Sequence, residues 1–227
     1  MAETITPRSR EIWDENRLVI MRYSFPMVVP IATERIWHKI TLWYYRLRSP
    51  FLAWMWGVKH GKRLRFQGKT IIRTRHSGEI RLGDNVVFNA QKGTNLVGLT
   101  GPTILDTLGG GRIEIGNRSG FSSIVMSSRS SITIGSRVKM GGNVRIFDHD
   151  YHSLEAEYRC TPDDRKHIRS KPVVIEDDCF IGTNAIILKG THLGPRTIVA
   201  AGSVVFGLVV PPDSMVKGNP AKVIERR

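Results

Sequence analysis

Residues 173–205 read VVIEDDCFIGTNAIILKGTHLGPRTIVAAGSVV, and a large aliphatic residue recurs at every sixth position. A small or slim residue stands two positions before each of them. The large residues are Ile175, Ile181, Ile187, Leu193, Val199 and Val205, and the slim ones are Val173, Cys179, Ala185, Thr191, Thr197 and Ser203. A helix requires apolar spacings of three and four, and an ordinary strand a spacing of two. A strict period of six predicts a coil of short strands and tight turns, with the large residues inside it.

The pattern divides the chain into three parts. Residues 1–65 lack it and form a basic, aromatic extension. Residues 66–210 carry it, weakly at first, and are predicted to form the β-helix domain. Pro211 and Pro212 end the last repeat, because proline cannot donate to a strand ladder. Residues 211–227 are therefore expected to form a tail or cap.

Two segments interrupt the repeat. Residues 91–112 are irregular and rich in glycine, so we expect a loop or a distorted coil there. Residues 153–172 are charged and contain no repeat, and the β-helix pattern resumes at Val173. The second segment is therefore predicted to leave the coil as an excursion loop.

Three motifs give the pattern a family likeness: Phe180-Ile181-Gly182-Thr183-Asn184-Ala185, Ala200-Ala201-Gly202-Ser203-Val204-Val205 and Gly218-Asn219-Pro220-Ala221-Lys222-Val223-Ile224. The sequence resembles the left-handed β-helix acyltransferases, which include galactoside, maltose and polysaccharide O-acetyltransferases. The resemblance implies a mainly β fold, a left-handed parallel β-helix with a partly helical N-terminal extension and a short C-terminal tail. It also implies a homotrimer with active sites at subunit interfaces. The left hand comes from the resemblance, since the general crossover rule would favour the right hand.

The composition favours a reducing compartment. The chain has 227 residues and only two cysteines, which is no disulfide framework. Cys179 is one of the slim residues of the six-residue repeat and is expected to be a core thiol, while Cys160 lies in a charged loop. The N-terminus shows no apolar run typical of a signal peptide. We therefore expect a cytoplasmic protein.

The net charge of +14 is concentrated in residues 1–75, and no acidic residue occurs from Arg35 to Arg75. Residues 31–65 mix this basic charge with tryptophan and tyrosine. Pro26, Pro30 and Pro50 predict short or kinked helices, and no run is long enough to span a bilayer. Two interpretations stay open for residues 31–65: peripheral contact with an anionic membrane, and a helical cap that packs its aromatic rings on the first coil. Nucleic acid is not expected, because a β-helix offers no groove-fitting element.

A polar motif stands just before the predicted excursion loop. It reads Asp148-His149-Asp150-Tyr151-His152-Ser153. Because alternate side chains of an extended chain share a face, His152 is expected beside Asp150, and His149 on the other face. Imidazole is a suitable general base near neutral pH, and a carboxylate on its second nitrogen fixes the tautomer.

The resemblance implies a role for this motif. In polysaccharide-type members the catalytic histidine ends a motif of the form Asp-x-Asp-x-His-Ser/Pro, which Asp148, Asp150, His152 and Ser153 match. His152 is therefore assigned as the base and Asp150 as its orienting partner. Simpler galactoside-type members differ by an offset of one residue at this histidine, which keeps His149 as the alternative.

The resemblance also implies the donor site. Acetyl-CoA lies between neighbouring subunits in the family, with its pantetheine arm along the coil edges. By position, the contacts implied here are Thr183, Ala201, Gly202 and Ser203 for the arm and Lys222 and Arg226 for the phosphates. Corner packing is an equal alternative for Ala201 and Ser203. Phe206-Gly207-Leu208 departs from the family's usual Thr-Lys-Asp, which puts a phosphate contact at that turn in doubt.

Together these features predict an O-acetyltransferase that moves acetyl from acetyl-CoA to a sugar hydroxyl, in a polysaccharide or lipid-linked glycan precursor. One alternative is N-acetylation of an amino sugar nucleotide. Another is a zinc enzyme like the gamma-type carbonic anhydrases, in which His149, His152 and either His167 or His192 would converge. No metal is expected on the first interpretation. A non-catalytic scaffold is the last alternative, which the histidine motif disfavours.

Overall fold

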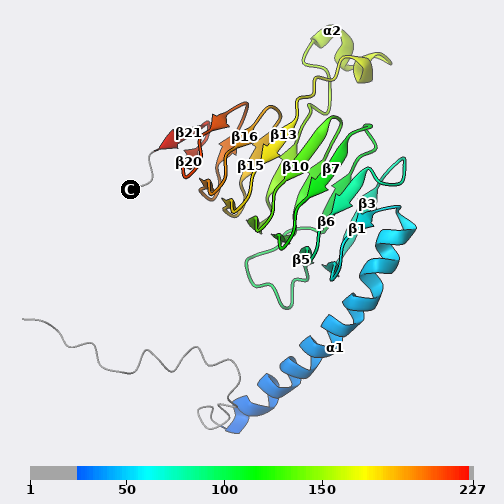
Figure 1. Cartoon of the computed structure of the whole chain (residues 1–227), viewed down its shortest axis with the longest axis vertical. Coiled ribbons are helices and arrows are strands. Elements are labelled where there is room, and N and C mark those ends of the chain that lie inside the picture. Colours follow the sequence, from blue (N-terminus) through cyan, green and yellow to red (C-terminus); the bar gives the residue numbers. More distant parts are fainter. Residues whose placement is uncertain (1–24, 225–227) are drawn as a thin grey trace, which may run out of the picture. The chain divides into compact units, whose positions relative to one another are not determined.

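The computed structural model describes the backbone of residues 25–224 and the side chains of residues 33–224. The chain forms two compact units, residues 1–41 and 42–227. One long helix, α1 (Phe25–Met55), is followed by 21 short strands that wind into a parallel β-helix (Figure 1). The predicted mainly β, left-handed β-helical fold is confirmed.

The coil has three walls, each a sheet of parallel strands that successive turns of the chain extend, except for the antiparallel β21 at the end of the second sheet. The strands of the first sheet, sheet A, are β1 (Lys59–His60), β4 (Ile80–Leu82), β7 (Arg112–Ile115), β10 (Ser131–Ile134), β13 (Val173–Ile175), β16 (His192–Leu193) and β19 (Val209–Val210). Those of sheet B are β2 (Arg65–Gly68), β5 (Val87–Ala90), β8 (Gly120–Ser122), β11 (Lys139–Gly142), β14 (Phe180–Ile181), β17 (Ile198–Val199), β20 (Met215–Gly218) and β21 (Ala221–Ile224). Those of sheet C are β3 (Thr70–Arg73), β6 (Thr103–Asp106), β9 (Val125–Ser127), β12 (Arg145–Phe147), β15 (Ile186–Leu188) and β18 (Val204–Val205).

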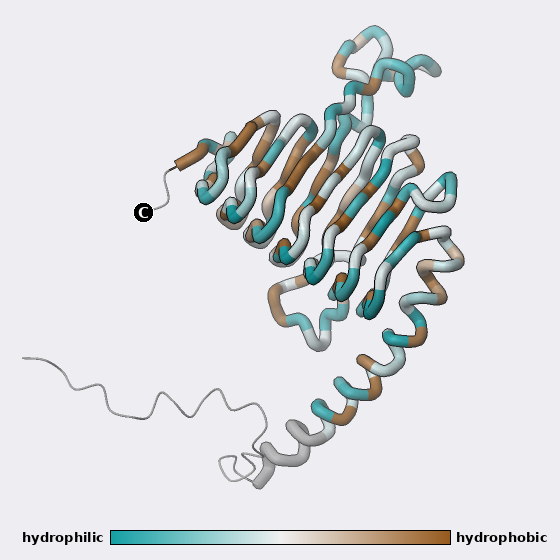
Figure 2. Tube along the Cα trace, viewed as in Figure 1, coloured by the Kyte–Doolittle hydropathy of each residue, from teal (hydrophilic) through white to brown (hydrophobic). Residues whose placement is uncertain are grey.

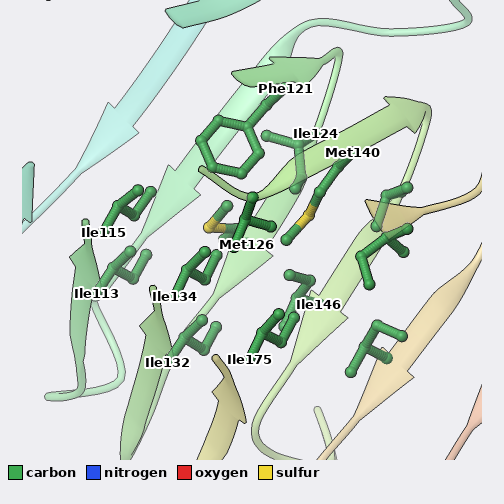
Figure 3. Packing of buried hydrophobic residues seen from close by; sticks show 14 of the residues in the cluster. Ile113, Ile115, Phe121, Ile124, Met126, Ile132, Ile134, Met140, Ile146 and Ile175 are labelled. Atoms are coloured by element: carbon green, nitrogen blue, oxygen red, sulfur yellow. The ribbon is translucent and has the colours of Figure 1, made fainter. Parts of the chain in front are cut away.

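The strand register places side chains of the same kind above one another inside the coil. Ile134 pairs with Ile175, and Ile146 with Ile187, each one coil apart. All twelve repeat residues of segment 173–205, six large and six slim, are 1% exposed or less. Figure 3 shows the large residues of the middle coils pointing into a common interior, and Figure 2 shows apolar residues recurring along each wall. The period of six therefore marks the inward positions, as predicted. Cys179 is among them, and burial raises the pKa of its thiol to about 11.

Gly182 illustrates why a glycine directly follows a large inward residue. A Cβ at this position would lie 2.4 Å from the backbone nitrogen of Ala201 in the next coil. The φ of Gly182 is not positive, so the backbone conformation of the turn does not require glycine. Glycine is required because the neighbouring coil approaches so closely that a side chain would not fit.

Three corners join the walls, and each has its own character. The first corner, between sheets A and B, carries residues in the left-handed backbone region at successive coils, among them Arg63, Asn85 and Arg118. The second corner, between sheets B and C, includes residues 182–185 and 200–203. The third corner, between sheets C and A, releases the excursion loop after β12.

Both interruptions of the repeat contain loops, but the first loop is shorter than the predicted range 91–112. The excursion between Phe147 and Val173 holds a short helix, α2 (Ala156–Arg159), and a 3-10 turn, η4 (Asp164–Lys166). The glycine-rich loop ends earlier than predicted, because Thr103–Asp106 forms β6 with Thr103 and Leu105 buried. Figure 1 shows the two loops leaving the coil on opposite sides.

The ends of the coil also differ from expectation. Strand β1 begins at Lys59, before the expected boundary at Phe66. At the C-terminal end the coil continues past residue 210, because β20 pairs in parallel with β17. Strand β21 then folds back on β20 as an antiparallel hairpin that caps sheet B. Among the described residues, no helix has both the length and the apolar character that crossing a bilayer requires.

The prediction of short N-terminal helices is wrong, because α1 runs over 31 residues through its prolines. Packing on the first coil compensates for the bond that Pro50 removes: Leu52 and Ala53 are buried there. The Ser49 hydroxyl accepts the backbone N–H of Phe66 at 2.7 Å, which satisfies a group on the first strand of sheet B. The helix thus caps the coil with small and aliphatic side chains.

Candidate active site

Asp148 anchors the base of the excursion loop. Its side chain is fully buried directly after β12, and it accepts hydrogen bonds from the Ser128 hydroxyl (2.7 Å) and the backbone N–H groups of Arg129 (2.7 Å) and Ser130 (2.8 Å). Its fourth partner is Nδ1 of His149 at 2.9 Å. Burial alone would raise the pKa of this carboxyl, but the four hydrogen bonds outweigh it and hold the pKa below its ordinary value.

Replacing Asp148 with asparagine is expected to destabilise the protein by about 1–3 kcal/mol at pH 7, because an amide cannot accept all four bonds. The depressed pKa sets the pH dependence. The contribution is fully present above the unfolded value of about 3.9 and is lost as pH falls through the lower folded value. Urea unfolding of wild type and Asp148→Asn should therefore differ at pH 7 and converge under acid conditions. The half-exposed Asp163→Asn serves as control, and equal stability of all three proteins at pH 7 would contradict the prediction.

His152 is positioned by the loop itself. Its Nδ1 lies 2.7 Å from Oδ2 of Asp164 in η4, and the Ser153 backbone N–H donates to the other carboxylate oxygen. These two bonds, with the Ser153 bond the larger cause, lower the pKa of the Asp164 carboxyl. The His152 side chain is 69% exposed. With Nδ1 held by a carboxylate, Nε2 faces solvent as the nitrogen able to accept a proton.

The expected pairing of His152 with Asp150 is wrong. Asp150 instead forms an ion pair with Lys189 of the β15–β16 turn, whose side chain is 9% exposed and lies 5.7 Å from the ring centre of Phe206. Strand β12 ends at Phe147, so the alternation that would place Asp150 beside His152 does not continue. An antiparallel bridge between His149 and Ser170 closes the loop base instead.

His149 occupies a different environment from His152. Its side chain is only 8% exposed, bonded to Asp148 and packed 4.9 Å from the ring of Tyr151. It is thus well oriented but poorly accessible. Both candidate histidines lie at the base of the excursion loop, where His149 is enclosed and His152 is open to solvent.

Four of the six predicted donor residues lie at the second corner, and Lys222 and Arg226 are the exceptions. Ala201 and Gly202 are exposed there, and Thr183 lies one coil away, its carbonyl accepting the Gly202 N–H at 2.9 Å. Ser203 points into the coil, where its hydroxyl accepts the Gly218 N–H at 3.2 Å. Its side chain therefore serves corner packing. Lys222 is exposed on β21, and Arg226 lies outside the described residues.

One chain does not bring the histidines and the donor corner together. They stand at the two ends of sheet C, separated by one wall of the coil. A wall of about five residues spans roughly 16 Å. Within one chain, the two corners therefore do not form a single site.

Sequence reasoning missed Asp164, Lys189 and Ser128 as partners of the motif. Asp164 follows the motif by twelve residues in an irregular loop, and no periodicity predicts its position. Lys189 stands at the corner one coil further on, so the repeat itself could have placed it near Asp150.

The histidines of the zinc alternative do not converge. Each contacts a different carboxylate, and the pairs are His149–Asp148, His152–Asp164, His167–Glu155 and His192–Glu176. Across residues 33–224, no group of three His, Cys, Asp or Glu side chains is arranged to hold a metal ion.

Known proteins share this architecture. Residues 172–206 match the family described as "Hexapeptide repeat of succinyl-transferase". WbbJ of Escherichia coli (strain K12), named as a lipopolysaccharide biosynthesis O-acetyl transferase, is 32% identical over 157 residues, which cover 67% of this chain and 74% of WbbJ. The chain belongs to the hexapeptide-repeat acyltransferase family. The prediction of a CoA-dependent acyltransferase is thereby confirmed, and this enzyme is an acetyltransferase of that family.

Solved structures extend the comparison. A hexapeptide-repeat containing acetyltransferase from Vibrio cholerae is 26% identical, with a TM-score of 0.50 over 80% of each chain. A variant of AntD, an N-acyltransferase from Bacillus cereus solved with dTDP-4-amino-4,6-dideoxyglucose and coenzyme A, has a TM-score of 0.63 at 17% identity, covering 79% of this acyltransferase and 88% of AntD. At that identity the likeness to AntD concerns the fold alone.

Proposed function

We propose that this acyltransferase moves an acetyl group from acetyl-CoA to a sugar hydroxyl, in a polysaccharide or lipid-linked glycan precursor. The observation that carries the proposal is the exposed His152, held through Nδ1 by Asp164. Such a histidine suits proton removal from a hydroxyl near neutral pH. The likeness to WbbJ supports a sugar hydroxyl as the acceptor.

In this mechanism Nε2 of His152 accepts the proton of the acceptor hydroxyl as its oxygen attacks the thioester carbonyl. The tetrahedral intermediate then expels the CoA thiolate. His152 returns its proton to that sulfur, so the base is regenerated and no acyl-enzyme is required. Asp164 stabilises the imidazolium formed between the two steps. Holding both substrates in one cleft supplies much of the acceleration.

Acetyl-CoA is the donor, and we place its pantetheine arm along the second corner. The exposed backbone at Ala201 and Gly202 allows close approach, with nothing within 4 Å of the position that a Cβ would take at Gly202. Thr183 borders the same corner, and Lys222 is available to the phosphates. Ser203 is not part of the proposed donor site, because its side chain points into the coil.

We propose a homotrimer in which the third corner of one subunit meets the second corner of the next. A ring of three closes such a head-to-tail contact. Mixing two inactive variants tests this: His152→Ala removes the base, and Ala201→Trp obstructs the donor corner. Each mixed trimer would contain one intact site, so co-refolded protein should regain activity that neither variant has alone. Light scattering should give three times the chain mass of 25.6 kDa. A mixture without activity, or an active monomer, would refute the arrangement.

The acceptor is tested by measuring acetyl-CoA turnover with a panel of oligosaccharides and amino sugar nucleotides. Alkaline hydroxylamine then distinguishes the products, since it cleaves an acetyl ester and leaves an amide. Transfer only to hydroxyls supports the proposal. Transfer only to amines would establish the N-acetyltransferase alternative.

We also propose that the enzyme works at the cytoplasmic face of a membrane, where acetyl-CoA and lipid-linked glycans meet. An exposed apolar stripe on α1 supports membrane contact. Within residues 42–55 its members follow helical spacing and are Trp43, Tyr44, Leu47, Phe51, Trp54 and Met55. Trp43 is 64% and Trp54 is 75% exposed, so these two rings do not pack on the first coil. Aromatic rings beside basic residues favour a membrane interface.

A further inference from the structure

A cleft of about 740 Å³ lies between the C-terminal half of α1 and the first corner of the first two coils. Arg46 and Pro50 of the helix form one side. Lys62, Arg63 and Arg65 of the coil form the other, and every charged residue that lines the cleft is basic. The cleft is two to three coils from the histidine motif, about 10 to 15 Å along the coil axis, and lies at a different corner, so it is not the acetyl-transfer site.

The basic groups of the cleft are not neutralised by the protein. Among residues 33–224, no ion pair joins Arg46, Arg63 or Arg65 to a carboxylate. Nε of Arg65 is buried without a hydrogen-bond partner. Asp84 lies near the turn, but its carboxylate accepts the backbone N–H of Lys62. Several cations around one cleft, together with an unused buried donor, are suited to a phosphate group, which offers several acceptor oxygens.

The helix connects the cleft to the exposed stripe. Trp43, Arg46, Pro50 and Trp54 follow one another at spacings of three, four and four, which places them in a single row along α1. The two residues that line the cleft therefore stand between two exposed tryptophans. A ligand phosphate in the cleft would have interface-seeking rings on both sides.

We propose that this cleft binds the phosphate group of an anionic membrane lipid, while Trp43 and Trp54 enter the interface beside it. The inference deepens the membrane contact proposed above and does not depend on the acetyl acceptor. A lipid is favoured over a soluble phosphate because the cleft adjoins the apolar stripe. The absence of acidic residues from Arg35 to Arg75 matches an anionic surface.

Tryptophan emission provides a direct readout, because all five tryptophans lie between Trp13 and Trp56 and none lies in the β-helix. The full-length protein is titrated with phosphatidylcholine vesicles, with or without phosphatidylglycerol, at 0.15 M salt. We expect a blue shift and binding only with the anionic vesicles. Arg63→Asn should weaken that binding about fivefold or more, since a basic residue at an anionic surface contributes about 1 kcal/mol.

The chain offers a matched control in Arg118. It is exposed, stands at the same first corner as Arg63, and has nearly the same backbone conformation, with φ of 58° against 59°. Asparagine tolerates that conformation at both positions. Arg118 lies two coils further on, about 10 Å away and beyond the screening length of about 8 Å at this salt. Arg118→Asn should change vesicle binding less than twofold.

Equal weakening by both variants would show attraction by net charge alone and would overturn the site. Binding of inorganic pyrophosphate that Arg63→Asn removes, with vesicle binding unchanged, would show that the ligand is soluble and not a lipid. Acetyl transfer to a soluble acceptor should be unchanged in both variants, which also checks their folding. Vesicle binding with no acetyl transfer in any protein would refute the proposed function and leave the cleft assignment intact.

Discussion

His152→Ala is expected to lower kcat by about 100-fold or more, because loss of a general base typically costs a factor of that order. Nε2 of His152 is the exposed nitrogen of a ring whose Nδ1 is held by Asp164. The KM for acetyl-CoA should change little, since this histidine acts on the acceptor. Steady-state kinetics with the acceptor identified by the panel would measure both constants.

Two variants make the test specific. Asp164→Asn should lower kcat less than His152→Ala does, because the ring remains and only its orientation and charge stabilisation are lost. His149→Ala removes the enclosed ring beside Asp148, so it should lower stability more than kcat. Near-normal turnover in His152→Ala with loss in His149→Ala would transfer the role of base to His149.

Phe88→Ala is expected to destabilise the enzyme by about 3–5 kcal/mol, the usual cost of truncating a buried phenylalanine. Phe88 is fully buried in sheet B. Its ring is stacked between Phe66 and Phe121 of the adjacent coils, at centroid distances of 5.1 and 5.0 Å. The substitution leaves a cavity that rigid coil walls cannot close. Urea unfolding monitored by circular dichroism would give the change in free energy.

Phe180→Ala is the matched control for Phe88. Phe180 belongs to the same sheet but points outward and is 50% exposed. Its replacement should cost less than about 1 kcal/mol, since little apolar area is returned to water. Equal losses from the two substitutions would mean that the stacked rings do not carry the stability of the N-terminal coils.

The sequence by itself determined the β-helix and the inward positions. Each repeat in residues 173–205 contacts the same kind of neighbour one coil away, so a local period of six is enough to identify which residues are buried. The same logic located the excursion loop and the polar motif at its base. It failed at Thr103–Asp106, where a single strand between irregular segments shows no period.

Only the tertiary structure decided which partners complete the site. Asp164 contacts His152 from the far part of the excursion, and Asp150 pairs with Lys189 instead of His152. Strand β12 ends at Phe147, and the chain bends again at Tyr151 and His152, so the alternation of side chains is lost. Alternation along a strand cannot predict contacts in a loop. The unbroken course of α1 and the basic cleft beside it likewise depend on how the helix packs on the first coil through Ser49, a contact between residues that no sequence period relates.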